Sequence, residues 1–410
     1  MGASHPSLFG IPVEFILFGL MLVGVARFHR RALRISLAGL LVILAFEALF
    51  TAFPTGRGAE ALIAHGAHEW VILTNLLLLL LGFEIVANQF EQSNISDHMP
   101  NRLPDTWAGG AMLLVIIFVL AAFLDNIAAA VLGGVMARHV YKGRVSVGFL
   151  AAIVAVANAG GAGSVIGDTT TTMMWLSGVS PLSVIHAFLG AGVALAIIAP
   201  LAARAQHKYQ PILAHDEPDH PLEWRRILIV AIILVIAVAA NIIATSLSDG
   251  EEHAPWLGLA LWAAILGTSL IAKPDWKVLR QGWKGALFLC SLVLAASLMP
   301  LTALPEPSWQ TAFGLGALSS VFDNIPLTAL ALGQGGYDWG LLSFAVGFGG
   351  SMTWFGSSAG VALTNLYPEG RSLTRWIKEG WFVPVGYVAG FLVMLALLGW
   401  APTHELAQAR

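Results

Sequence analysis

Charged residues are scarce in this sequence. They make up 11% of 410 residues, whereas soluble domains carry about 25%. Hydrophobic residues reach 57% and the mean hydropathy is +0.77, so polar groups are too few to cover a water-soluble surface. The net charge of -3 gives no indication of a nucleic-acid partner. A single cysteine, Cys290, excludes an internal disulfide.

Long apolar runs are present instead, and several reach the roughly 20 residues that cross a bilayer. They predict an all-α polytopic membrane protein with about ten transmembrane spans. The first run has no basic region before it and no small-residue cleavage site after it, so it is expected to be a retained span. The spans are predicted near 8–26, 35–53, 69–87, 146–178, 183–203, 227–247, 256–272, 284–300, 339–366 and 381–400.

Two motifs occur twice along the chain. An Asp-Asn pair lies inside an apolar segment in each half, as Asp125-Asn126 and as Asp323-Asn324. A glycine-broken polar stretch follows each pair, at 160–169 and at 349–358. Carboxylates and broken helices at matching places in two halves of an apolar chain point to the midplane binding site of a transporter.

The two segments that carry the Asp-Asn pairs, 107–137 and 309–332, are predicted to be re-entrant hairpins that turn back at those pairs. With hairpins at these places, 19 of the 21 Lys and Arg residues fall on one side of the membrane. Lys and Arg concentrate in cytoplasmic loops. The chain is therefore expected in a cell inner (plasma) membrane with both termini outside.

A polar, proline-containing linker at 204–226 separates two halves, and it is expected in the cytoplasm. Each half has five spans and one hairpin, so the second half enters the membrane from the opposite side. This predicts two inverted repeats, 1–203 and 227–400. The first hairpin opens inward and the second outward. The hairpin tips and the broken spans are expected to meet at one polar cavity. Non-helical backbone at membrane depth has unpaired N–H and C=O groups, which need polar surroundings.

Asp125 and Asp323 are the main candidates for the site. A carboxylate inside a bilayer is costly, so it is a functional-site hypothesis by default. Out of water it binds a proton more readily, and a proton and Na⁺ can then compete for it. The plainer alternative is that each aspartate only caps the helix that follows it, and the two roles are compatible.

Further polar residues are expected to complete the site. Asp168 has Ser357 as its counterpart in the second half, and it either titrates or caps the half-helix that begins at Thr169. Asn158 either lines the cavity or bonds between helices. Of the run 169–172, only the first two threonines are candidates, because threonine hydroxyls can bond back to a helix turn. The other oxygen donors expected around Na⁺ are Asn126, Ser164, Thr169, Thr170, Asn324, Thr353, Ser357 and Ser358.

At these residues the chain resembles the ion transporter superfamily, and within it the NhaD-type sodium/proton antiporters and their citrate-transporter-like relatives. The resemblance covers roughly 35–400. It implies a homodimer with a scaffold part and a transport part that moves the site across the membrane. The motifs that carry it are Phe123-Leu124-Asp125-Asn126-Ile127, the run from Asn158 to Thr170, Val321-Phe322-Asp323-Asn324-Ile325-Pro326 and the glycine stretch at 349–360.

The dicarboxylate members of that superfamily carry Ser-Asn-Thr at the hairpin tips, where this chain has aspartates. Two carboxylates would repel citrate, so the sequence predicts a sodium (or lithium)/proton antiporter without a cofactor, transporting Na⁺ and H⁺. A sodium- or proton-coupled anion transporter, including arsenite-type efflux, remains the alternative. A passive channel is also possible. An intramembrane aspartyl protease is disfavoured because the Gly-x-Gly-Asp signature is missing before Asp168, so no enzyme is expected.

Overall fold

In the computed structural model, nearly all regular structure is helical. The structure describes residues 6–28, 31–50, 52–53, 56–57, 59–94, 103–213, 221–247, 254–300 and 303–402. The exceptions among these are two short antiparallel hairpins near the N-terminus, β1 (Ser7–Leu8) with β2 (Ile11–Pro12) and β3 (Ala52–Phe53) with β4 (Gly56–Arg57). The all-α prediction is thus confirmed for the described chain, whereas both terminal ends lie outside it.

Each predicted span has a helix, or a pair of helices, at its position. Among the described residues, some helices are long and apolar enough to cross a membrane unaided: Ala32–Phe50, Glu69–Glu91 and Pro181–Tyr209, with the bent pair Leu373–Glu379 and Phe382–Leu398 as a fourth. Several further apolar helices are shorter, with 10–17 residues. The helices at the predicted unbroken spans are α1 (Val13–Arg27), α2 (Ala32–Phe50), α3 (Ala59–Glu91), α9 (Pro181–Ile185), α10 (Ala187–Tyr209), α11 (Trp224–Leu247), α12 (Trp256–Thr268), α13 (Leu279–Ser297), α18 (Leu373–Glu379) and α19 (Phe382–Leu398).

Both segments with an Asp-Asn pair form two helices joined at that pair. The first consists of α5 (Trp107–Ala121) and α6 (Asn126–Val140), and the second of α14 (Trp309–Ser319) and α15 (Asn324–Gln334). At 1.5 Å per residue, 15 residues of helix span about 22 Å, less than the roughly 30 Å of a hydrocarbon core. Helices this short fit a segment that turns back at its tip.

Both glycine-broken stretches interrupt a helix, as the sequence predicts. The first separates α7 (Val147–Ala162) from α8 (Thr169–Leu176). The second lies between α16 (Trp339–Gly349), which continues into a 3-10 turn at Gly350–Met352, and α17 (Ser358–Leu366). Every residue of α7 and α16 is buried. A helix that is apolar all round belongs in the interior, so these two interrupted helices form the centre of the molecule.

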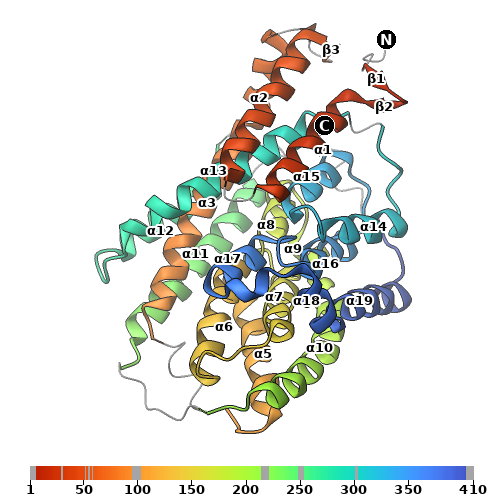
Figure 1. Ribbon diagram of the computed structural model, residues 1–410. Coiled ribbons are helices and arrows are strands. Elements are labelled where there is room, and N and C mark those ends of the chain that lie inside the picture. The colour runs from red at the N-terminus through yellow and green to blue at the C-terminus, as the bar shows by residue number, and fades with distance from the viewer. Residues whose placement is uncertain are drawn as a thin grey trace.

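The helices form two groups (Figure 1). One group comprises α1, α2, α3, α11, α12 and α13, which pack mainly on one another. The other surrounds the interrupted helices and contains α5 to α10 and α14 to α19. Contacts of α13 with α15 and of α3 with α8 connect the groups. Each group draws helices from both halves of the chain, so the two halves interleave in space.

The segment predicted to be a linker, 204–226, is partly helical. Helix α10 extends through Arg204 to Tyr209, and α11 already begins at Trp224. Arg204 lies over the ring of Trp107 at 4.3 Å from its centroid, which joins the end of α10 to the start of the first hairpin. Residues 214–220 of this segment lie outside the described chain.

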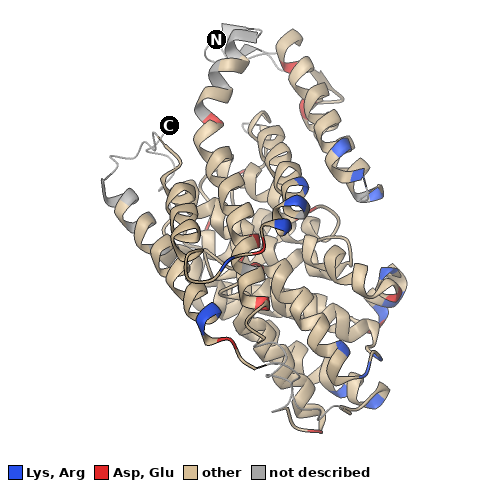
Figure 2. Cartoon of the chain, turned by 90° about the vertical axis from the view of Figure 1, so that its left-hand side faces the viewer, with Lys and Arg blue, Asp and Glu red and all other residues tan. Residues whose placement is uncertain are grey.

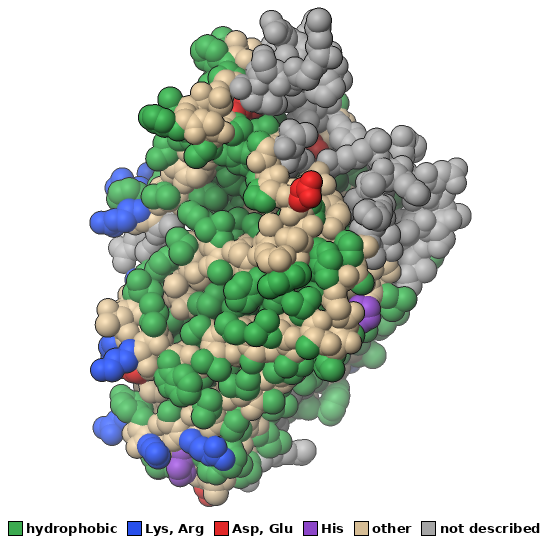
Figure 3. Space-filling model, turned by 90° about the vertical axis from the view of Figure 1, so that its right-hand side faces the viewer, with side chains coloured by type: hydrophobic (Ala, Val, Ile, Leu, Met, Phe, Trp, Pro, Cys, Tyr) green, Lys and Arg blue, Asp and Glu red, His purple; other side chains and the backbone are tan. Residues whose placement is uncertain are grey.

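Lys and Arg are unevenly distributed over the surface. On the face drawn in Figure 3, hydrophobic side chains cover the middle and the basic side chains lie along one edge. Figure 2 shows most of the basic residues along the corresponding flank. An apolar belt with basic groups to one side is the distribution expected of a membrane protein.

Candidate functional site

Each hairpin tip places its aspartate at the start of the second helix. Asp125 caps α6, where its Oδ2 accepts a hydrogen bond of 3.2 Å from the backbone N–H of Ile127. Asp323 caps α15 in the same way, with a bond of 3.2 Å from Ile325. Both aspartates therefore do cap helices. Each such bond occupies only one of the two carboxylate oxygens.

The two tips differ at that second oxygen. In the second hairpin, the hydroxyl of Ser358 donates a hydrogen bond of 2.8 Å to Asp323 Oδ2. In the first half, Thr169 stands at the corresponding place and is buried at the first position of α8. The second oxygen of Asp323 is thus held by a hydroxyl of the broken helix in the same half of the chain. The partner asparagines, Asn126 and Asn324, are both buried at the first positions of α6 and α15.

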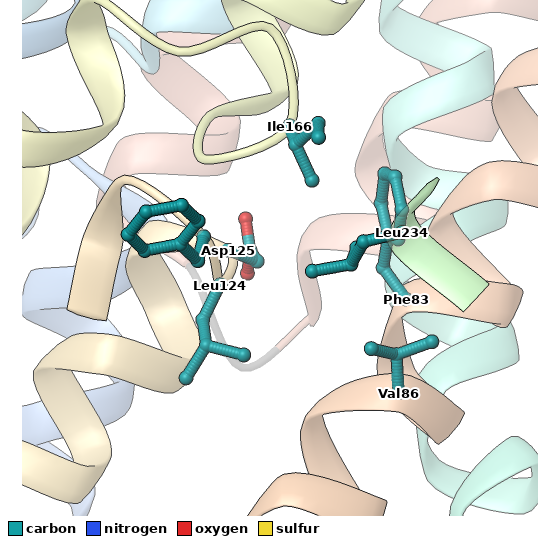
Figure 4. A pocket seen from close by; sticks show the side chains of 7 residues that line it. Phe83, Val86, Leu124, Asp125, Ile166 and Leu234 are labelled. Atoms are coloured by element: carbon teal, nitrogen blue, oxygen red, sulfur yellow. The ribbon is translucent and has the colours of Figure 1, made fainter. Parts of the chain in front are cut away.

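A small pocket lies beside the first tip (Figure 4). Asp125 is its only polar side chain, and α3 and α11 supply the opposite wall. This pocket includes neither Asp323 nor Asp168, so it is narrower than the predicted cavity shared by both tips. It lies where the two helix groups meet and gives the carboxylate a desolvated setting. Its lining residues are Phe83, Val86, Phe123, Leu124, Asp125, Ile166 and Leu234.

Asp168 lies deeper in the molecule, with only 1% of its surface exposed. Its Oδ1 caps α8 by accepting a bond of 3.2 Å from Thr170 N–H. Its Oδ2 is buried without a hydrogen-bond partner in the described chain. That oxygen faces Gly347 of α16, where an added Cβ would approach it to 2.9 Å. Asp168 thus caps α8 through one oxygen and keeps its other oxygen buried at the contact with α16.

A side-chain hydrogen bond joins the two broken segments. Asn158 of α7 donates from its Nδ2 to the hydroxyl of Ser351 at 2.9 Å, so it does bond between helices. Its Oδ1 and the hydroxyl of Thr170 are buried without partners in the described chain, as is Asp168 Oδ2. Unsatisfied buried oxygens are costly, and oxygen donors are what hard cations prefer. The sequence prediction does not include Ser351, whose counterpart in the first half is Ala162.

The other predicted hydroxyls already have partners. Ser164 and Thr353 each donate to a backbone carbonyl near a hairpin tip, and Ser357 caps α17 by accepting from Gly360. Thr171 and Thr172 bond back to the carbonyl of Asp168. This is the bonding back to a helix turn for which the sequence analysis leaves them out of the candidate residues.

The site is acidic. The charged groups close enough to act on Asp125 are Asp168 and Glu84, and Asp323 acts on Asp168. No Lys or Arg is among the groups acting on either residue, and Figure 2 shows the basic residues mostly at the flank. Within the described residues no cluster of three His, Cys, Asp or Glu side chains offers a resident metal site. The arrangement suits a transported cation better than an anion.

Comparison with known proteins identifies a transporter family. Residues 15–349 match the citrate transporter family. The chain is 25% identical to Sodium/proton antiporter 1 of Arabidopsis thaliana over 423 residues, which cover 93% of this chain and 72% of the relative. It is 26% identical to the Na⁺/H⁺ antiporter NhaD of Vibrio parahaemolyticus over 356 residues, or 74% of this chain and 85% of the relative.

A second NhaD antiporter, from Halomonas elongata, is 24% identical over 377 residues, covering 79% of this chain and 75% of the relative. The family match spans well over half of the chain and includes the first hairpin, the first broken helix and the second hairpin. The chain therefore belongs to the citrate transporter family, and it is a multi-pass secondary transporter of the membrane rather than an enzyme.

Proposed function

We propose that this transporter exchanges Na⁺ or Li⁺ for protons, with Asp125 and Asp323 as the residues that bind them in turn. The observation that carries the proposal is the placement of a carboxylate at each hairpin tip, with Asp168 between the broken helices. These carboxylates act on one another without a neutralising Lys or Arg in the sets of groups that act on Asp125 and Asp168. Such a site is stabilised by binding either protons or a cation.

The exchange follows from competition for the same oxygens. A proton on Asp125 or Asp323 removes the charge that holds Na⁺, and a bound Na⁺ displaces the proton. The oxygens without partners on Asn158, Asp168 and Thr170 complete the supply of hard ligands. Binding of one species thus requires release of the other, which is sufficient for antiport.

Anion transport is the second candidate, because the matched family is described as a citrate transporter. A citrate ion would meet carboxylates at both tips. The relatives named above carry sodium/proton antiporter in their names. Anion transport coupled to sodium or protons is therefore the second candidate, after cation/proton antiport.

We propose further that the chain consists of two inverted repeats, 1–203 and 227–400, with ten spans and two re-entrant hairpins. The same order of hairpin and interrupted helix in both halves supports this. An odd number of spans in each half would invert the second relative to the first. The basic flank would then face the cytoplasm of a cell whose inner (plasma) membrane holds the protein, with both termini outside. We also propose a homodimer, as the resemblance to the superfamily implies.

The proposal is tested in everted membrane vesicles from a strain without antiporters of its own. Respiration acidifies the vesicles, and a quenched fluorescent base reports the gradient. We expect added Na⁺ or Li⁺ to restore fluorescence in vesicles with the protein, because cation entry drives proton exit. Potassium serves as the control cation. Uptake of labelled citrate without any cation-dependent recovery would instead favour the anion transporter.

A further inference from the structure

Two hydroxyl groups connect the hairpin tips to the broken helices in the same way. Ser164 donates to the carbonyl of Ala122 at 2.6 Å, and Thr353 donates to the carbonyl of Ser320. Ala122 and Ser320 are the C-terminal caps of α5 and α14, and each precedes its tip aspartate by three residues. The last carbonyls of a helix lack partners within the helix. Each hydroxyl therefore supplies a missing donor at a hairpin tip.

Glycines bring the backbones together beside each hydroxyl. A Cβ at Gly160 would lie 2.1 Å from the carbonyl oxygen of Phe118, and one at Gly349 would lie 2.0 Å from that of Gly316. Phe118 and Gly316 both lie seven residues before the tip aspartate. The broken stretch thus rests directly on the first helix of each hairpin. We name the contact of Ser164 and Gly160 with α5 the first clasp, and that of Thr353 and Gly349 with α14 the second clasp.

The hydroxyl of Ser164 has no capacity left for an ion. It donates once, to Ala122, and accepts from the N–H groups of Ile166 and Gly167 at 3.3 Å each. A serine hydroxyl has one proton and two lone pairs, and all three are in use. Thr353 donates to Ser320 and accepts from Gly356 at 2.9 Å. Coordinating Na⁺ through Ser164 would require one of these backbone bonds to break.

We propose that Ser164 and Thr353 are positioning residues that hold the two hairpin tips to the broken helices, and that neither coordinates the transported ion. Each clasp fixes its tip aspartate relative to the half-helix that follows the break. The proposal rests on the proposed antiport for its functional consequence. The clasp itself is a property of the fold and can be measured without transport.

The test uses one reporter at each tip. Phe123 and Val321 stand two residues before the tip aspartates and are 57% and 44% exposed. Each is replaced by cysteine in a Cys290→Ala background, since Cys290 is the chain's one cysteine. The rate of labelling by N-ethylmaleimide then reports how freely each tip opens. Ser164→Ala and Thr353→Val remove the hydroxyls, whereas Ser164→Thr and Thr353→Ser keep them.

We expect Ser164→Ala to speed labelling at position 123 about fivefold, the change that the loss of one hydrogen bond produces, and to leave position 321 unchanged. Thr353→Val is expected to speed labelling at position 321 by a similar factor and to leave position 123 unchanged. The hydroxyl-retaining variants should label at the parent rate. In vesicles, Ser164→Ala should lower the maximal exchange rate without altering the preference between Na⁺ and Li⁺.

Two results would overturn the proposal. One is unchanged labelling at position 123 in Ser164→Ala together with weakened Na⁺ affinity or an altered Na⁺ to Li⁺ preference, because that identifies a ligand. The other is unchanged labelling at position 123 and unchanged transport in Ser164→Ala, because the hydroxyl then does not position the hairpin tip. If the parent protein exchanges no cation at all, the proposed antiport fails, and the two labelling rates still decide whether the clasps exist.

Discussion

Replacing Asp125 or Asp323 with asparagine is expected to abolish Na⁺-driven proton exchange, down to the level of vesicles without the protein. Asparagine is as good a helix cap as aspartate, so its amide oxygen can still accept the N–H bonds at the starts of α6 and α15. At Asp125 the substitution removes the charge and the titrating proton. At Asp323 it also removes the bond from the Ser358 hydroxyl, because an amide nitrogen cannot accept it. The exchange is measured by fluorescence recovery in everted vesicles with matched amounts of protein.

Asp338 provides the control for this substitution. It also caps a helix, accepting a bond of 3.0 Å from Leu341 at the start of α16, but it lies at the opposite end of α16 from the broken stretch. We expect Asp338→Asn to transport at close to the parent rate. Full exchange in both Asp125→Asn and Asp323→Asn would mean that the two aspartates serve as caps alone.

Substituting alanine for Gly160 or Gly349 is expected to lower the free energy of unfolding by about 3 kcal/mol, the upper part of the range for overpacked interiors. The added Cβ would lie 2.1 Å from the carbonyl oxygen of Phe118 or 2.0 Å from that of Gly316. Both obstacles are backbone atoms of a helix, which cannot rotate away as a side chain can. A melting temperature in detergent well below that of the parent protein would be the signature.

Gly192 and Gly314 are the matched controls, because a Cβ at either meets nothing within 4 Å. Gly192 lies in α10, and Gly314 lies in α14 two residues before Gly316. Alanine in a helix is favoured over glycine by up to about 1 kcal/mol, so these variants should melt at or slightly above the parent temperature. Equal melting temperatures for Gly160→Ala and Gly192→Ala would show that the first broken stretch does not pack directly on α5.

The sequence was sufficient to predict the helical class, the break at each Asp-Asn pair and the two glycine interruptions. The Asp-Asn pairs and glycine stretches are strong local signals, because caps and glycines act within a few residues of their own position. Boundaries were less accurate. Helix α7 continues through Gly160 and Gly161 to Ala162, since both glycines keep helical backbone and serve close packing there. Helix α10 likewise runs into the predicted linker.

Contacts between distant segments could not be predicted. The bond from Asn158 to Ser351 joins the two halves of the chain, and the bond from Ser358 to Asp323 joins the second hairpin tip to the half-helix α17 of the same half. Helix α7, which carries Asn158, is buried on all sides, so its sequence has no polar face to indicate which neighbour each side meets. Ser164 and Thr353 lie in the breaks, and their bonds to the carbonyls of Ala122 and Ser320 are likewise contacts between distant segments.

The most direct measurement places the purified protein in liposomes with an internal pH indicator and imposes a Na⁺ gradient with no other driving ion. If Na⁺ and H⁺ compete for the tip carboxylates, an inward Na⁺ gradient will make the interior alkaline, and Asp125→Asn will remove the response. No pH change with Na⁺ or Li⁺ in liposomes that accumulate citrate would contradict the account and assign the site to an anion.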